Sequence, residues 1–169
     1  MKKLTLILSV LISLAVILAS CGTTAAYVNK DFGIGFAPAS GLEMADEAEI
    51  AAYASDGVMC EMMASDPDTG SAVVVSVEDA MFDSAEEYLE AVKEALSIDG
   101  FNVIFGDIET VEIAGAEFAV IEYSVSADGI DATMATCARI EGDQMFVINA
   151  SYSDAAQLDG FLSCFVAAR

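Results

Sequence analysis

The stretch FAVIEYSVSADGIDATMATCARIEGDQMFVINASY, residues 118–152, predicts three antiparallel strands joined by two tight turns. The turn sequences are Asp128-Gly129 and Gly142-Asp143, and both are typical of two-residue β-hairpin loops. A type I′ loop at Asp128-Gly129 and a second turn at Gly142-Asp143 fix the register of the three strands. The predicted pairs are Ala127 with Ile130, Val125 with Ala132, Tyr123 with Met134, Ile121 with Thr136, Ile140 with Met145, Arg139 with Phe146, and Cys137 with Ile148.

This register makes both faces of the predicted sheet apolar. One face carries the residues that are paired across the Asp128-Gly129 turn. The other face carries Phe118, Val120, Cys137, Phe146, Ile148 and Tyr152. A sheet that is apolar on both faces needs helices or other layers on both sides. We therefore expect an α+β domain with a mostly antiparallel sheet flanked by helices.

The rest of the chain supplies further strands and two helices. Strands are expected at 32–38, 58–64, 72–77, 102–105 and 108–113, with a polar loop or helical turn at 41–49. Ser84-Ala85-Glu86-Glu87 is a capping box that begins a helix ending near Ile98. A last helix is expected to be capped by Ser153 and to carry Leu158, Phe161, Leu162 and Phe165 on one face.

The N-terminus has the pattern of an export signal. Lys2 and Lys3 precede an apolar run from Leu4 to Ala19, which is too short to cross a bilayer comfortably and typical of a secretory signal peptide. The run closes with Leu18-Ala19-Ser20-Cys21, which resembles a bacterial lipobox. We predict that residues 1–20 are removed and that Cys21 becomes acylated; an ordinary signal peptide followed by a chance cysteine is the alternative.

Three segments follow from this assignment. Residues 1–20 are the lipoprotein signal peptide, residues 21–30 a lipidated spacer, and residues 31–169 a single domain. The mature chain of 149 residues suits one hydrophobic core. The short spacer would hold the domain close to the membrane.

The mature chain is strongly acidic. Four basic residues remain after Cys21 against 28 acidic ones, which leaves a net charge of −24. Such a charge excludes nucleic acid as a partner. A solubilising surface is the simpler interpretation; a site for divalent cations or a basic partner is the alternative.

Three cysteines remain besides Cys21. These are Cys60, Cys137 and Cys164, and because their number is odd, at most one internal disulfide can form. Buried free thiols are the alternative, and the sequence leaves the two open.

The order of these elements resembles the PsbP-like family, an α/β/α sandwich shared by the photosystem II extrinsic protein, a Ran-binding protein and many bacterial surface lipoproteins. The residues that carry the resemblance are Gly33-Ile34-Gly35-Phe36-Ala37-Pro38, the helix from Ser84, Val111-Glu112-Ile113-Ala114-Gly115, Glu122-Tyr123, and Phe146 to Tyr152 before the last helix. Leu42 departs from the pattern, since such proteins often carry a tryptophan after the proline turn. The resemblance implies a non-catalytic accessory or assembly module and carries over no binding residues.

Few residues could support catalysis. The chain has no histidine, which removes histidine-based triads and general bases and the commonest zinc ligand. Lys30 and Lys93 offer no buried amine for a serine–lysine pair. A carboxylate-dependent cell-wall or glycan hydrolase stays as an alternative function, because 28 acidic residues guarantee close pairs.

Two segments raise the alternative of a metal-binding envelope protein. Met59-Cys60-Glu61-Met62-Met63 concentrates soft sulfur ligands, but strand alternation would put Cys60 and Met62 on one face and Met59 and Met63 on the other. Asp66-Pro67-Asp68-Thr69-Gly70 hints at a calcium loop, but a hairpin loop explains it better. No metal or cofactor site is assigned.

Arg139 is the basic residue placed nearest the predicted core. The register sets it between Phe118 and Phe146, where it could extend along the apolar surface or stack on a ring. Anchoring the carboxylate of a ligand is the alternative role.

The sequence therefore predicts a lipoprotein on the extracytoplasmic face of a cell membrane. Its expected partners are membrane lipid, through acylated Cys21, and an unidentified envelope protein. Its expected role is non-catalytic binding or assembly.

Overall fold

A computed structural model describes residues 27–53, 58–97, 102–127 and 130–168. Its helices are α2 (Glu47–Tyr53), α3 (Ala85–Leu96) and α4 (Ala155–Ser163). Its strands are β1 (Tyr27–Asn29), β2 (Ile34–Phe36), β3 (Glu43–Met44), β4 (Val58–Ser65), β5 (Ala72–Asp79), β6 (Asn102–Ile113), β7 (Ala116–Ala127), β8 (Ile130–Glu141), β9 (Gln144–Tyr152) and β10 (Phe165–Ala167). None of the helices described has both the length and the apolar character that a bilayer span requires.

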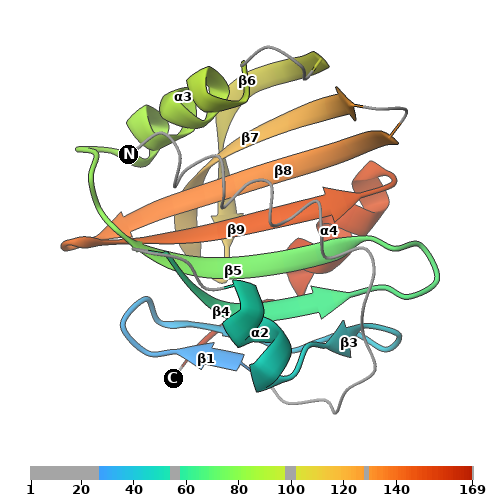
Figure 1. The fold of residues 1–169 in the computed structure, drawn as a ribbon. Helices are drawn as coiled ribbons and strands as arrows, with labels where there is room; N and C mark the ends of the chain where they lie inside the picture. The colour runs from blue at the N-terminus through green and yellow to red at the C-terminus, as the bar shows by residue number, and fades with distance from the viewer. Residues whose placement is uncertain (1–26, 54–57, 98–101, 128–129, 169) are drawn as a thin grey trace.

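A seven-stranded antiparallel sheet forms the centre of the domain, in the order β3-β4-β5-β9-β8-β7-β6 (Figure 1). The predicted register of its three central hairpin strands is confirmed at every pair, including Tyr123 with Met134 and Cys137 with Ile148. The residues of the expected loop at 128–129 lie outside the described residues. The hydrophobic pattern therefore specifies the register, because a slip by one residue would turn each side chain to the opposite face.

Helix α3 covers one face of this sheet along β6, β7 and β8 (Figure 1). Its apolar side inserts Tyr88, Leu89 and Val92, each fully buried, against Ile121 and Met134 of the strands. The predicted cap is confirmed, since the Ser84 hydroxyl accepts a hydrogen bond from the Glu87 N–H at 3.2 Å. Helix α2 packs on the same face over β4, so the two helices stand at opposite ends of the sheet.

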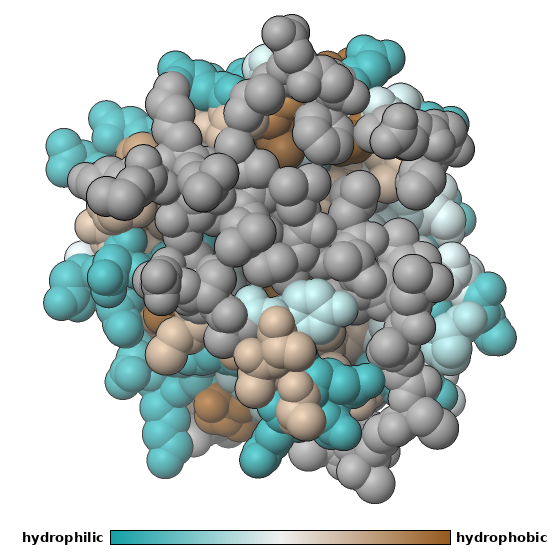
Figure 2. Space-filling view, in the orientation of Figure 1, coloured by the Kyte–Doolittle hydropathy of each residue, from teal (hydrophilic) through white to brown (hydrophobic). Residues whose placement is uncertain are grey.

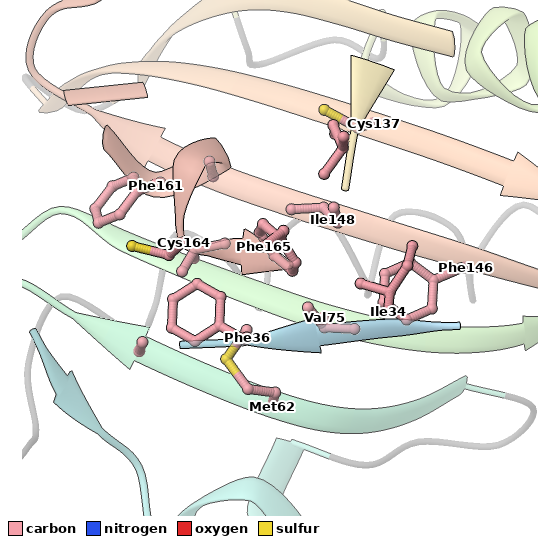
Figure 3. Packing of buried hydrophobic residues seen from close by; sticks show 14 of the residues in the cluster. Ile34, Phe36, Met62, Val75, Cys137, Phe146, Ile148, Phe161, Cys164 and Phe165 are labelled. Carbon is pink, nitrogen blue, oxygen red and sulfur yellow. The ribbon is translucent and has the colours of Figure 1, made fainter. Parts of the chain in front are cut away.

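The opposite face is covered by a second sheet and by α4. The small sheet has the order β1-β2-β10, and its Ile34 and Phe36 point into a core with Val75, Phe146 and Ile148 of the large sheet (Figure 3). The ring of Phe32 contacts that of Phe146 in the large sheet, and within the small sheet the ring of Phe36 contacts that of Phe165; the ring centroids of each pair are 5.0 Å apart. The expectation of layers on both sides of the sheet is thus confirmed, with a sheet contributing to one of them.

The folded domain begins earlier than expected. Tyr27, Val28 and Asn29 pair with β2 as strand β1, so three residues of the expected spacer belong to the small sheet. The Tyr27 hydroxyl donates to the Glu61 carboxylate, and the Asn29 amide donates to the same carboxylate at 2.9 Å. Strand β1 is therefore tied to β4.

A bulge changes the faces of β4. The pairing with β5 shifts between Cys60 and Met62, so Glu61 is the extra residue. Because of the bulge, Cys60 shares a cluster with Met63, whereas Met62 enters the core under the small sheet. The prediction that Cys60 and Met62 share a face is therefore wrong.

The C-terminal helix also differs in detail from expectation. Asp154 rather than Ser153 is its N-cap, and the Asp154 carboxylate accepts from the Gln157 N–H at 3.0 Å. The helix stops at Ser163, and Phe165 belongs to β10. Strands 102–105 and 108–113 join as one strand, β6, with a bulge between Phe105 and Ile108.

Candidate functional site

A row of buried polar side chains crosses the large sheet beneath α3. The Tyr123 and Thr136 hydroxyls are 3.2 Å apart, and the Thr136 hydroxyl donates to the Asn149 side-chain oxygen at 2.8 Å. All three residues are at most 2% exposed. The predicted register placed Thr136 opposite Ile121 on this face, but nothing in the sequence indicated that its hydroxyl would join polar groups from three adjacent strands.

Glu78 is a buried carboxyl at the end of β5, only 6% exposed. Burial raises its pKa to about 7, although hydrogen bonds from the Ser76 and Tyr88 hydroxyls act in the opposite direction. Those contacts are long, 3.4 and 3.5 Å. The donors of both hydrogen bonds are hydroxyl groups, one from the same strand and one from α3.

The loop between β4 and β5 is fastened to α4 through Gln157. The Gln157 amide nitrogen donates to the Thr69 hydroxyl at 2.8 Å and to the Asp66 carboxylate at 3.1 Å, while its oxygen accepts from Ser71 at 2.7 Å. The Thr69 hydroxyl, together with neighbouring N–H groups, lowers the pKa of Asp66. The segment considered as a calcium loop is therefore a hairpin loop, and its first carboxylate, that of Asp66, accepts hydrogen bonds from Thr69 and Gln157.

Arg139 lies on the wall of a pocket of about 570 Å³ between the start of α3 and strands β6, β7 and β8. The register places it opposite Phe146, as predicted. One guanidinium nitrogen donates to the Phe32 carbonyl at 3.2 Å and another to the Glu141 carboxylate at 2.5 Å. The bond to Phe32 connects the large sheet to the β1–β2 turn, and the bond to Glu141 lies within β8. A ligand carboxylate at this point would compete with Glu141.

The three cysteines beyond Cys21 are free thiols. Cys137 and Cys164 are buried in the core under the small sheet, and Cys60 is half-buried in the cluster on the other face (Figure 3). Burial raises the pKa of Cys60 to about 11 and that of Cys137 to about 12. These two thiols stay protonated near neutral pH, which makes them poor nucleophiles and poor metal ligands.

Soft-metal ligands do not converge on β4. Met59 is 58% exposed, Met62 and Met63 are buried in different clusters, and Cys60 shares a cluster with Met63 only. Throughout the described ranges, no group of three or more cysteines and acidic residues is arranged to hold a metal ion. Cys21, the predicted lipidation site, lies outside those ranges.

Comparisons with solved structures define the fold. The solution structure of the cyanobacterial PsbP protein (CyanoP) from Synechocystis sp. PCC 6803 has a TM-score of 0.57 at 16% identity, and the likeness covers 89% of this chain and 98% of that one. A crystal structure from Bacteroides thetaiotaomicron has a TM-score of 0.53 at 11% identity, over 85% of this chain and 48% of that one. LpqN, described as involved in cell envelope biogenesis of Mycobacterium tuberculosis, has a TM-score of 0.49 at 15% identity, over 79% of this chain and 82% of that one.

The sequence itself matches no protein-family model and no curated protein. The structural likeness shows that the fold is PsbP-like, in agreement with the resemblance drawn from the sequence. At these identities the likeness concerns the fold alone, because proteins of one fold carry unrelated functions.

Proposed function

We propose that this protein is a lipoprotein held by acylated Cys21 on the extracytoplasmic face of a cell membrane. The observation that carries the proposal is the Leu18-Ala19-Ser20-Cys21 sequence directly after the apolar run. Two or three acyl chains on one residue anchor a protein stably, whereas a single chain binds only marginally. The position of β1 supports this arrangement, since Tyr27, the first residue of this strand, follows Cys21 by only six positions.

The domain on this anchor acts as a non-catalytic binding or accessory module. Its buried polar groups support this role, because Tyr123, Thr136 and Asn149 are linked by hydrogen bonds and Gln157 fastens a loop. Glu78, the carboxyl with a raised pKa, contacts hydroxyls instead of a second acid. Its partner would be an envelope protein, reached from a position fixed beside the bilayer.

Replacing the lipidated cysteine tests the anchor. The Cys21→Ser variant should fold normally and leave the membrane fraction, because the variant lacks the acylated residue and none of the described helices is long and apolar enough to cross a bilayer. Cys60→Ser is the matched control and should stay with the membranes, since this half-buried thiol belongs to the folded domain. Membrane retention of Cys21→Ser, measured by fractionation of intact cells, would contradict the proposal.

Crosslinking in intact membranes tests the binding role. The wild-type protein should yield a defined crosslinked partner, and the yield should fall when the domain is released by Cys21→Ser. Equal background capture by both forms, under gentle conditions, would argue against a binding module.

A further inference from the structure

The outer face of the small sheet carries an exposed apolar row. Val28, Gly35 and Val166 are direct neighbours in the register of β1, β2 and β10. Val28 is 54% exposed and Val166 45% exposed. A Cβ atom built on Gly35 would lie 3.5 Å from a methyl of Val166 and 3.6 Å from a methyl of Val28, so the two valines converge over the glycine.

This sheet is also nearly free of carboxylates in a very acidic protein. Strands β1, β2 and β10 contain no aspartate or glutamate, and neither do residues 32–42 or 160–168. The turn after β1 carries one charge of each sign, Lys30 and Asp31. The Arg139 guanidinium reaches the same turn through the Phe32 carbonyl, at 3.2 Å. The small sheet is therefore a roughly neutral surface on a protein of net charge −22.

The tether begins at the same sheet. Tyr27, the first described residue of β1, follows Cys21 by six positions, so the connecting chain spans about 20 Å at full extension. Hydrogen bonds from Tyr27 and Asn29 to Glu61 fix this end of β1 to β4. An acylated Cys21 would consequently hold the small sheet near the lipid, while β6 stands at the far edge of the large sheet (Figure 1).

We propose that the outer face of the small sheet, centred on Val28, Gly35 and Val166, rests on the surface of the phospholipid bilayer. The proposal depends on the lipid anchor proposed above. A short tether keeps the sheet at high local concentration beside the membrane, so a weak contact suffices. An anionic leaflet repels the carboxylate-rich remainder of the domain within about 8–10 Å, which turns the neutral face toward the lipid.

Single tryptophans provide the test, because the natural chain contains none. Val28→Trp and Val166→Trp place a probe on the proposed face, and Ile104→Trp, at a position 67% exposed on β6, is the matched control. Each lipidated variant is reconstituted into vesicles of equal parts phosphatidylcholine and phosphatidylglycerol, with bromine on the acyl chains as a quencher. The probes at 28 and 166 should lose most of their emission, and the probe at 104 should keep nearly all of it.

Flotation of the vesicles separates the two proposals. If the variants float but show equal emission at all three positions, the proposal that the small sheet faces the membrane is overturned and the proposal of the lipid anchor is retained. Lipidated protein that fails to float overturns the anchor and the inference that depends on it. A blue shift at position 28 without vesicles, together with a dimer in solution, would assign the face to a second copy of the chain and also overturn the proposal.

A charged variant gives an independent readout. Val28→Glu should leave flotation unchanged and raise the accessibility of a tryptophan at 166 to an aqueous quencher, because the added carboxylate is repelled by the leaflet. Ile104→Glu is the control and should leave that accessibility as it was. An unchanged accessibility in Val28→Glu would contradict docking of this face.

Discussion

Glu78 shows how one buried group makes the stability of the domain depend on pH. Burial raises the pKa of this carboxyl from 4.5 to about 7 in the folded protein. The folded state therefore holds its proton more tightly than the unfolded chain does. The free energy of unfolding contributed by Glu78 is highest below pH 4.5 and falls as the pH rises to about 7, where the buried group ionises.

Glu78→Gln should accordingly stabilise the protein at alkaline pH and change little under acid conditions. At pH 8 we expect the free energy of unfolding to rise by something on the order of 2 kcal/mol, since glutamine keeps the shape of the side chain and removes the buried charge. Urea denaturation at pH 4 and pH 8 measures the difference. Asp79→Asn, at the exposed neighbouring position, is the control and should show no such pH-dependent gain.

A glutamine variant that is no more stable than wild type at pH 8 would mean that the Glu78 carboxyl is already well solvated. The strand predicted at 72–77 stopped before this residue, so its burial could not be foreseen. A carboxylate is normally exposed, and the tertiary contact with Tyr88 of α3 accompanies the burial of this one.

At the scale of elements, the β6–β7 turn stores backbone strain. Ala114 has a φ of 55° and Gly115 a φ of 81°, so both central residues of the two-residue loop lie in the left-handed region that a type I′ turn requires. Glycine occupies this region freely, but alanine does so at a cost of about 1–2 kcal/mol.

Ala114→Asn should therefore stabilise the hairpin, because asparagine followed by glycine is the preferred sequence for this turn. We expect a gain of about 0.5–1 kcal/mol in the free energy of unfolding, measured by thermal or urea denaturation. Gly115→Ala is the opposing control, since it puts a second Cβ at positive φ and should destabilise the protein. A destabilised Ala114→Asn would show that packing of the alanine methyl outweighs the strain.

The long edge strand β6 is protected against pairing with other chains. Its free edge runs for 12 residues, but a bulge interrupts its register between Phe105 and Ile108. Asp107, Glu109 and Glu112 add exposed charge along it. A bulge and like charges are common means of preventing edge-to-edge association, so we do not regard this strand as a docking site.

Long elements were predictable from the sequence, and so was the short strand β2, which lies within the strand expected at 32–38; β1 and β10 were not. The hairpins of β7, β8 and β9 carry a period-2 pattern and explicit turn residues, and α3 carries a capping box, so each has several signals that agree. Strand β1 has three residues and exists only because β2 and Glu61 hold it. The bulge at Glu61 and the capping of α4 by Asp154 likewise depend on neighbours distant in sequence.

The candidate binding features were harder to predict than the fold. Arg139 was correctly placed opposite Phe146, but its contacts with Phe32 and Glu141 depend on the small sheet. The hydrogen-bonded row of Tyr123, Thr136 and Asn149 follows from the confirmed register, yet each residue alone is ordinary in a strand. Sequence patterns report which face a residue occupies, and hydrogen-bond geometry across strands requires the structure.

At the scale of the whole molecule, the arrangement of layers and the distribution of charge both agree with an orientation in which the small sheet faces the bilayer. The small sheet and α4 cover one face of the large sheet, and α3 and α2 the other. In the view of the face covered by α3 and α2, hydrophilic side chains lie along the rim of the domain (Figure 2). The neutral small sheet adjoins the predicted tether, so the acidic remainder would face away from the bilayer and toward an envelope partner.

Mass spectrometry of the N-terminal peptide shows whether acyl chains on Cys21 hold this domain at the membrane. The protein is extracted from membranes with detergent and digested, and the mass of its first peptide is determined. We expect a chain that begins at Cys21 and carries a diacylglyceryl group on its sulfur. A mature chain whose Cys21 is unmodified, or a chain that retains residues 1–20, would contradict the account.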